Sequence, residues 1–175
     1  RCTGKYGFSP DTLTNLGFTD QVVSVAAHFR RGAGDYVVEV TSNVEDLWSI
    51  DASITLAGDM VSEFSKGSRY RPRMKDMRVV FEDESLNARV EQYCGRLGMS
   101  ADQIRAAQLE KLRYMGEVYG IEFDEYVIDP YTEFLAGKST LVVTAKPTEP
   151  VSLSQITLYK PSDVPALLDL SAEAL

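Results

Sequence analysis

The most constraining feature of this sequence is an amphipathic segment near its front. Residues 46–58 read Asp-Leu-Trp-Ser-Ile-Asp-Ala-Ser-Ile-Thr-Leu-Ala-Gly. Successive side chains of a strand point to opposite faces. One face would carry Trp48, Ile50, Ala52, Ile54 and Leu56, and the other Ser49, Asp51, Ser53 and Thr55. This alternation predicts a sheet with one face in a core and the other in contact with water.

Neighbouring segments predict that this strand belongs to an antiparallel meander. Residues 20–30 alternate through Val23, Val25, Ala27 and Phe29. A return strand is predicted from Tyr36 to Thr41, because the glycines between residues 31 and 35 suit a hairpin turn. A fourth strand is predicted around Val79, whereas Pro72 disfavours a central strand within residues 60–72.

The apolar period changes from two to that of a helix after Ser85. Helices are predicted over residues 85–97, 100–120 and 129–137, the last beginning at Asp129-Pro130. The run Ser100-Ala-Asp-Gln103 matches a capping box. Short helices are also predicted over residues 9–17 and 162–170.

Strands separated from helices along the chain indicate an α+β fold. Residues 141–145 and 151–159 are predicted to form a C-terminal hairpin that extends the first sheet. We therefore expect one α+β domain over residues 1–175, with an antiparallel meander covered on one face by the helical block. Trp48, Ile50, Ile54 and Leu56 are expected to be buried under the helix that begins at Ser100.

The net charge of −8 argues against phosphate backbones and anionic membrane surfaces as partners, so nucleic acid is a poor candidate. The basic stretch Lys66–Arg78 could form a local patch, or a solvated strand edge that discourages pairing. No run of 18 apolar residues occurs, so no transmembrane segment is expected in this chain. Because the sequence starts at Arg1, we expect it to be a fragment or mature form of a longer precursor.

Two cysteines, Cys2 and Cys94, are far apart in the sequence. We predict a Cys2–Cys94 disulfide in an oxidising compartment, where it would close a loop of roughly 90 residues and contribute up to about 4–5 kcal/mol. The alternative is two unrelated thiols, with Cys94 a small buried residue of a helix.

Few residues in this sequence suggest catalysis or metal binding. His28 is the only histidine, and the two cysteines lack the usual ligand spacing, so no metal site and no cofactor are expected. The acidic residues Glu122, Asp124, Glu125 and Asp129 could bind Ca²⁺, act as an acid/base pair, or form a polar connection between helices. We expect no catalytic constellation, and we expect His28 and Asp124 to be surface residues.

Aromatic residues are dense in the helical block. Within 21 residues the chain has Tyr114, Tyr119, Phe123, Tyr126, Tyr131 and Phe134. They could form a core over the sheet or line an apolar pocket. The candidate ligand-binding residues are Tyr114, Tyr119, Phe123 and Tyr126.

Two segments resemble a known group of proteins. Residues 134–156 contain Phe-Leu, a strand and then Lys-Pro-Thr-Glu-Pro-Val, and the front contains a Gly-Asp hairpin and Leu-Trp-Ser-Ile-Asp-Ala-Ser-Ile-Thr-Leu-Ala-Gly. Together they cover about a third of the chain and resemble uncharacterised cell-envelope proteins of Gram-negative bacteria, which carry a signal peptide or anchor. The resemblance implies a periplasmic, non-catalytic domain and transfers no functional residue.

Three hypotheses for the function follow. The first is a non-enzymatic binding or structural module of the bacterial envelope that holds an apolar ligand or partner between sheet and helices. The second is a hydrolase that lacks a local motif and uses the Glu122–Asp129 carboxylates. The third is a domain that docks into a larger assembly through a free sheet edge.

Overall fold

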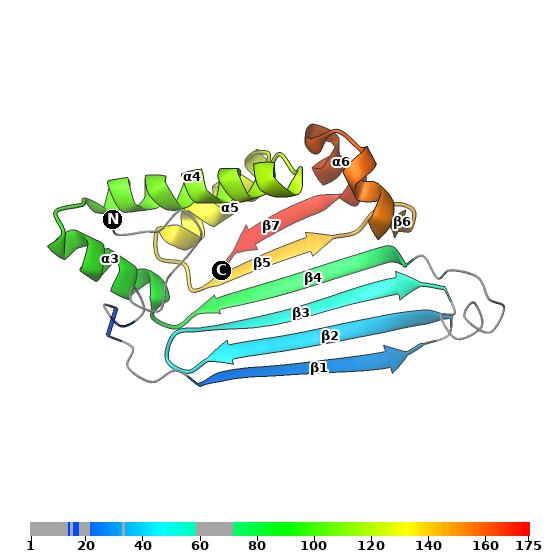
Figure 1. Ribbon diagram of the computed structural model, residues 1–175, viewed down its shortest axis with the longest axis horizontal. Helices are drawn as coiled ribbons and strands as arrows, with labels where there is room; N and C mark the ends of the chain where they lie inside the picture. The colour runs from blue at the N-terminus through cyan, green and yellow to red at the C-terminus, as the bar shows by residue number, and fades with distance from the viewer. Residues whose placement is uncertain (1–13, 15, 18–21, 33, 59–71) are drawn as a thin grey trace.

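The computed structural model of the chain describes residues 14, 16–17, 22–32, 34–58 and 72–175. Its strands form one antiparallel sheet in the order β1-β2-β3-β4-β5-β7, with β6 beside β4 (Figure 1). The strands are β1 (Val23–Arg31), β2 (Asp35–Val44), β3 (Trp48–Ala57), β4 (Arg73–Asp83), β5 (Thr140–Ala145), β6 (Val151–Ser152) and β7 (Leu170–Ala174). The α-helices are α3 (Leu86–Arg96), α4 (Ala101–Tyr119), α5 (Glu125–Leu135) and α6 (Val164–Leu168). The predicted α+β class is confirmed.

The predicted meander is also confirmed. Strands β1 to β4 pair in sequence order and antiparallel. Gly34 has a φ of 91° in the first hairpin, a conformation that glycine adopts without steric cost. Strand β4 is longer than predicted and starts at Arg73, directly after Pro72. Pro72 thus precedes the strand, where its missing N–H removes no ladder bond.

Strand register produces one continuous apolar face. Across the sheet, one row contains Ala27, Val40, Ala52, Val79 and Val143, and the next contains Val25, Ser42, Ile50, Phe81 and Leu141. We call this side of the sheet the apolar face. The opposite face carries cross-strand polar pairs: Ser49 donates to Glu82 at 3.3 Å, and Thr55 donates to Asp76 at 3.1 Å.

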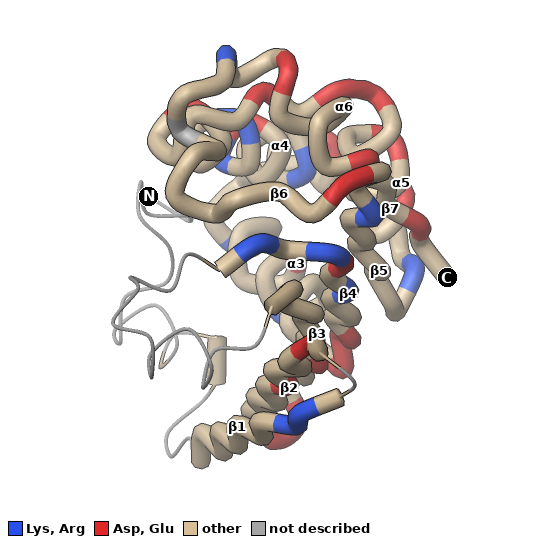
Figure 2. The backbone as a smooth tube through the Cα atoms, turned by 90° about the vertical axis from the view of Figure 1, so that its right-hand side faces the viewer, with Lys and Arg blue, Asp and Glu red and all other residues tan. Residues whose placement is uncertain are grey.

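The helices cover only part of the apolar face. Helices α4 and α5 lie along the β4–β5–β7 side, and α6 lies at one end of the same side (Figure 1). Strands β1 and β2 extend away from the helices as a single layer (Figure 2). Figure 2 also shows that acidic and basic residues are intermingled over the described chain. None of the described helices is long and apolar enough to cross a membrane.

Two clusters of buried side chains hold the helices in place. The first joins α3 to α4 and includes Val90, Cys94 and Ile104. The second joins α6 to β4, β5 and β6 and includes Met74, Ala145, Val151, Val164 and Leu168. Both clusters lie near the helices, so the core is at the end of the strand order that contains β4, β5 and β7 and not at the β1 end.

The predicted burial of the Trp48 strand was only partly right. Trp48, Ile50, Ile54 and Leu56 share one face, but all are half-buried rather than buried. Helix α4 does not cover them, because it stands over β4 and β5, with whose side chains it lines a common cavity. Ile54 and Leu56 instead pack against the α6 cluster. Trp48 stacks on Phe81 with ring centroids 6.0 Å apart.

The C-terminal prediction was wrong in detail. Residues 151–159 form only the two-residue strand β6, followed by a 3₁₀ helix over Leu153–Leu158. The partner of β5 in the C-terminal hairpin is β7, a strand in a region that was predicted to be helical near Leu170. Asp169 ends α6 in the left-handed conformation, with a φ of 45°, and lets the chain turn back along β5.

Helix α5 also begins earlier than predicted. Its N-cap is Asp124, and Pro130 lies inside the helix instead of at its start. A proline within a helix removes one backbone hydrogen bond. The helix persists because Val127, Phe134 and Leu135 are buried on one side, and burial of this stripe offsets the lost bond.

The boundaries of α3 and α4 agree with the prediction. Helix α4 begins with the capping box, in which Gln103 N–H donates to Ser100 Oγ and Ser100 N–H donates to the Gln103 side chain. Gly120 ends it in the left-handed conformation. Three of the sequence predictions fall partly or wholly outside the described residues. These are the start of the predicted 9–17 helix, Cys2 of the predicted disulfide, and Lys66, Arg69 and Arg71 of the basic stretch. The Cys2–Cys94 disulfide therefore stays a prediction.

Candidate functional site

A cavity of about 370 Å³ lies between the helices and the apolar face. Its volume falls in the range of about 300–1,000 Å³ that is usual for small-molecule sites. Most of the lining is apolar: Val79, Phe81, Leu86, Ala107, Leu112, Met115, Phe134, Leu135, Leu141 and Val143. The polar side chains of the lining are Asn87, Gln108, Lys111 and Tyr131.

Helix α4 forms one wall of this cavity through residues at helical spacing. Gln108, Lys111, Leu112 and Met115 follow the i, i+3, i+4, i+7 pattern that places side chains on one face of a helix. The floor comes from β4 and β5. Helix α5 adds aromatic rings: Phe134 meets Phe81 edge to face at 5.5 Å, and Tyr131 stacks near Phe134 at 6.3 Å.

The polar groups of the cavity are partly shielded from water. Gln108 Nε2 donates to Asn87 Oδ1 at 3.3 Å, which links α4 to α3. Burial lowers the pKa of the Lys111 ammonium and raises the pKa of the Tyr131 hydroxyl. Both shifts favour the uncharged form, as expected where nearby protein replaces solvent.

Asp83 supports this corner of the cavity from the end of β4. Its carboxylate accepts the backbone N–H of Asn87 at 3.2 Å, within the first turn of α3. Burial raises the pKa of Asp83, and the hydrogen bonds from Asn87 and Leu86 oppose that shift. We interpret Asp83 as a residue that positions α3, because it is not part of the cavity lining.

The four candidate ligand-binding residues lie elsewhere. Tyr119 and Tyr126 are 67% and 76% exposed, and Tyr114 is half-buried on α4. Phe123 lines a separate hollow with Arg113 and Glu117. None of the four lines the apolar cavity. A ligand-binding role for them stays a prediction.

Sequence reasoning missed the residues that do line the cavity. Tyr131 and Phe134 belong to the aromatic cluster noted in the sequence but were not selected. The available signal was the α4 stripe, in which Gln108 and Lys111 interrupt an otherwise apolar series at helical spacing. A polar side chain at such a position faces the interior and therefore marks a candidate site.

The acidic and histidine candidates are all exposed. Glu122, Asp124, Glu125 and Asp129 lie at the surface around the start of α5, and His28 lies on β1 opposite Glu39. Over residues that the structure describes, no group of three or more His, Cys, Asp or Glu side chains could hold a metal ion. The hydrolase hypothesis and the catalytic role of these carboxylates stay untested.

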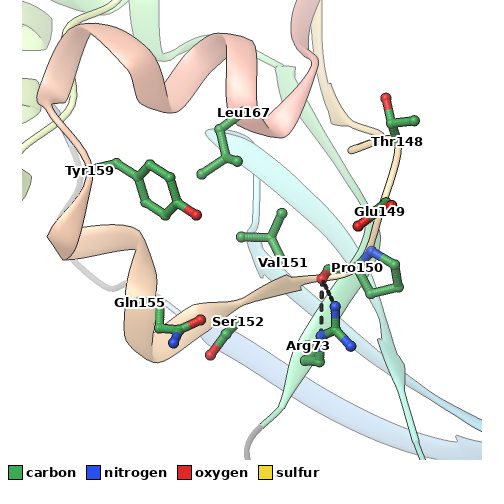
Figure 3. A pocket seen from close by; sticks show the side chains of 9 residues that line it. All are labelled: Arg73, Thr148, Glu149, Pro150, Val151, Ser152, Gln155, Tyr159 and Leu167. Carbon is green, nitrogen blue, oxygen red and sulfur yellow. Dashed lines mark hydrogen bonds between the residues drawn. The ribbon is translucent and has the colours of Figure 1, made fainter.

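A second hollow of about 550 Å³ lies where β4 meets β6 (Figure 3). Its cation, Arg73, donates from Nε and Nη2 to the backbone oxygen of Pro150, at 3.1 and 2.8 Å. Thr148 and Glu149 lie in the connection after β5, whereas Ser152 lies on β6 and Leu167 on α6. This hollow is larger than the cavity under α4. We nevertheless favour the cavity, because its walls come from five elements (α3, α4, α5, β4 and β5) and are mainly apolar.

The fold and the cavity define a class of protein: an α+β domain with an antiparallel sheet, partly covered by helices, and an apolar cavity under that cover. A family model described as "Uncharacterized protein" matches residues 41–175, and the chain belongs to this family. The matched residues include every side chain that lines the cavity. No curated protein and no solved structure matches the chain.

Proposed function

We propose that this protein is a non-enzymatic binding module that holds an apolar ligand in the cavity between the sheet and α4. The observation that carries this proposal is the composition of the lining, in which ten of the fourteen side chains are apolar. Apolar walls with a few polar groups are typical of sites for small hydrophobic molecules. Removing an apolar ligand from water supplies about 25 cal/mol for each Å² buried.

The test compares two consecutive alanines of α4 that face different ways. Ala107 lines the cavity, whereas Ala106 is exposed. Titration with the neutral fluorescent probe N-phenylnaphthylamine should saturate with the unmodified protein. Ala107→Phe should fill part of the cavity and weaken binding at least tenfold, and Ala106→Phe should leave it unchanged.

Two results would overturn the proposal: the unmodified protein fails to bind the probe saturably, or both variants bind it equally. Thermal unfolding of each variant shows whether Ala107→Phe still folds. If that variant is unfolded, Val143→Ile on the cavity floor replaces it, with Val37→Ile on β2 as its control.

The envelope location belongs to the same proposal. It is supported by the resemblance of the front meander and of residues 134–156 to envelope proteins. Fractionation of cells that express the natural gene should recover the protein with the periplasm or membranes. Recovery with cytoplasmic markers alone would overturn the location and leave the binding proposal standing.

A second candidate function is docking through the sheet edge, and the exposure of β1 favours it. Val23, Val25 and Phe29 are 57%, 67% and 72% exposed, although they belong to the apolar face. Among the described strands, β1 pairs only with β2. A long edge strand with exposed apolar side chains is a template for another strand.

The occupant that this edge fits best is a second copy of β1. Antiparallel pairing about Ala27 would place Val25 opposite Phe29 and would extend the apolar face across both copies. The Arg30 side chains of the two copies would then lie about 20 Å apart, because each faces Ser24 of the other. Parallel pairing would instead bring the like charges together.

Sedimentation equilibrium tests this second candidate. We expect a dimer, and we expect Val25→Lys to shift it to monomer. Val118→Lys is the matched control, because Val118 is 57% exposed but lies on α4. A monomer at all concentrations, or a dimer that Val25→Lys does not weaken, would contradict docking through β1.

A further inference from the structure

The polar side chains of the cavity lining carry positive but no negative charge. Lys111 is the cationic residue among the fourteen lining residues, and the lining contains no Asp or Glu. This is notable because the whole chain has a net charge of −8. The other polar residues of the lining are two amides and one phenol, which are neutral.

The position of Lys111 is also unusual for a lysine. It lies in the sheet-facing stripe of α4, between Gln108 and Leu112, where an apolar residue would be expected. Lysine is seldom placed in such a stripe, because partial burial of its ammonium costs solvation free energy. Arg113, two residues further along the same helix, is exposed and does not line the cavity.

We infer that the ligand is a single-chain amphiphile with an anionic head group, and that Lys111 binds this head group while the chain lies among the apolar side chains. The inference rests on the proposed function, which supplies the apolar part of the ligand. A carboxylate has the charge that complements the Lys111 ammonium, and hydrogen bonds between two such charged groups are short and strong. The Tyr131 hydroxyl, from the opposite helix, can donate to the same kind of group.

Three ligands with one chain length and different head groups test the inference. Decanoate, decanol and decyltrimethylammonium, each below its micelle concentration, compete with N-phenylnaphthylamine for the unmodified protein. We expect decanoate to compete at least tenfold better than the other two. Equal competition by all three would overturn the anionic head group but leave apolar binding intact.

Variants at Lys111 locate the source of that preference. Lys111→Met keeps an unbranched apolar stem but removes the charge, so it should reduce the affinity for decanoate to that for decanol. Lys111→Glu should reverse the preference in favour of decyltrimethylammonium. Arg113→Met, on the exposed side of α4, should change nothing.

The outcomes separate the two proposals. If the probe itself does not bind, the proposed function fails and the inference fails with it. If the probe binds and decanoate keeps its advantage in Lys111→Met, the cavity binds ligands but Lys111 does not select them. Binding of the neutral probe to Lys111→Met shows that this variant retains its fold.

Discussion

The two sides of this sheet have the same alternation of side chains but different surroundings. On the helix-covered side, Phe134 of α5 packs on Phe81 and is only 4% exposed. At the other end of the strand order, Phe29 of β1 also belongs to the apolar face, but it is 72% exposed. An apolar periodicity of two therefore predicts that a strand has an apolar face, but not that this face is covered.

The difference also concerns function. The cavity forms only where α4 and α5 stand over β4 and β5, because a cavity needs walls on both sides. Strands β1 and β2 carry a similar row of apolar side chains but extend away from the described helices (Figure 2). The covered side suits a small ligand, and the uncovered side suits another polypeptide.

The largest expected effect comes from truncating one phenylalanine on each side. Phe134→Ala should lower the free energy of unfolding by about 3–5 kcal/mol, because it removes a buried ring from the helix–sheet contact. Phe29→Ala should change it by less than about 0.5 kcal/mol in dilute protein. Urea denaturation measures both, and equal losses would show that β1 is covered in solution.

The next effect tests the facing of β3. Ile54→Asp should cost about 3 kcal/mol, because it places a charge against the apolar α6 cluster. Ser53→Asp, one residue away, should cost less than about 0.5 kcal/mol, since Ser53 lies on the polar face opposite Arg78. The same denaturation assay applies, and similar costs at the two positions would mean that the facing is wrong.

A smaller effect is expected at Gly116, where α4 closely approaches the backbone of Ile121. A Cβ on Gly116 would lie 2.5 Å from the backbone oxygen of Ile121, so Gly116→Ala should cost about 2 kcal/mol. Gly95→Ala on α3 meets nothing within 4 Å and should stabilise by up to about 1 kcal/mol. Calorimetry of both variants should show opposite shifts in Tm, and a gain from Gly116→Ala would indicate a looser cover than described.

The smallest effect concerns pH and Asp83. Burial raises the pKa of Asp83 in the folded protein above the ordinary value of 3.8. Protonation of Asp83 therefore stabilises the folded state fully at pH values below 3.8, and this stabilisation is lost as the pH rises through the raised pKa. Asp83→Asn should remove this pH dependence, and near neutral pH it should change stability by no more than about 0.5 kcal/mol, because the carboxyl is half-exposed. Denaturation at several pH values tests this, with exposed Glu84→Gln as control; a D83N profile that matches the unmodified protein would count against it.

Much of the fold could be predicted because its signals are local. The capping box at Ser100 and the left-handed Gly120 bound α4 as expected, since both depend on hydrogen bonds within a few residues. The α5 boundary could not be predicted in this way. Asp129-Pro130 has the sequence of a helix start, but Val127 is buried on the same side of the helix as Phe134, and this contact favours a helix that begins before Asp129.

The candidate site was harder to predict than the fold. The sequence showed that aromatic residues were concentrated between Tyr114 and Phe134, and the cavity does use two of that cluster. It could not show which ones, because Tyr126 and Tyr131 lie on different sides of α5. Lys111 was overlooked since a lysine in a helix is ordinarily a solvated residue.

The sequence by itself determined the antiparallel meander, the position of the main helices and the existence of one apolar face. These follow from side-chain alternation, capping and glycine conformations, which act over a few bonds. Only the tertiary structure decided that β7 pairs with β5, that the helices cover β4 and β5 but not β1, and that a cavity lies beneath them. Such contacts join residues far apart in the chain, and their free energy depends on how whole elements fit together.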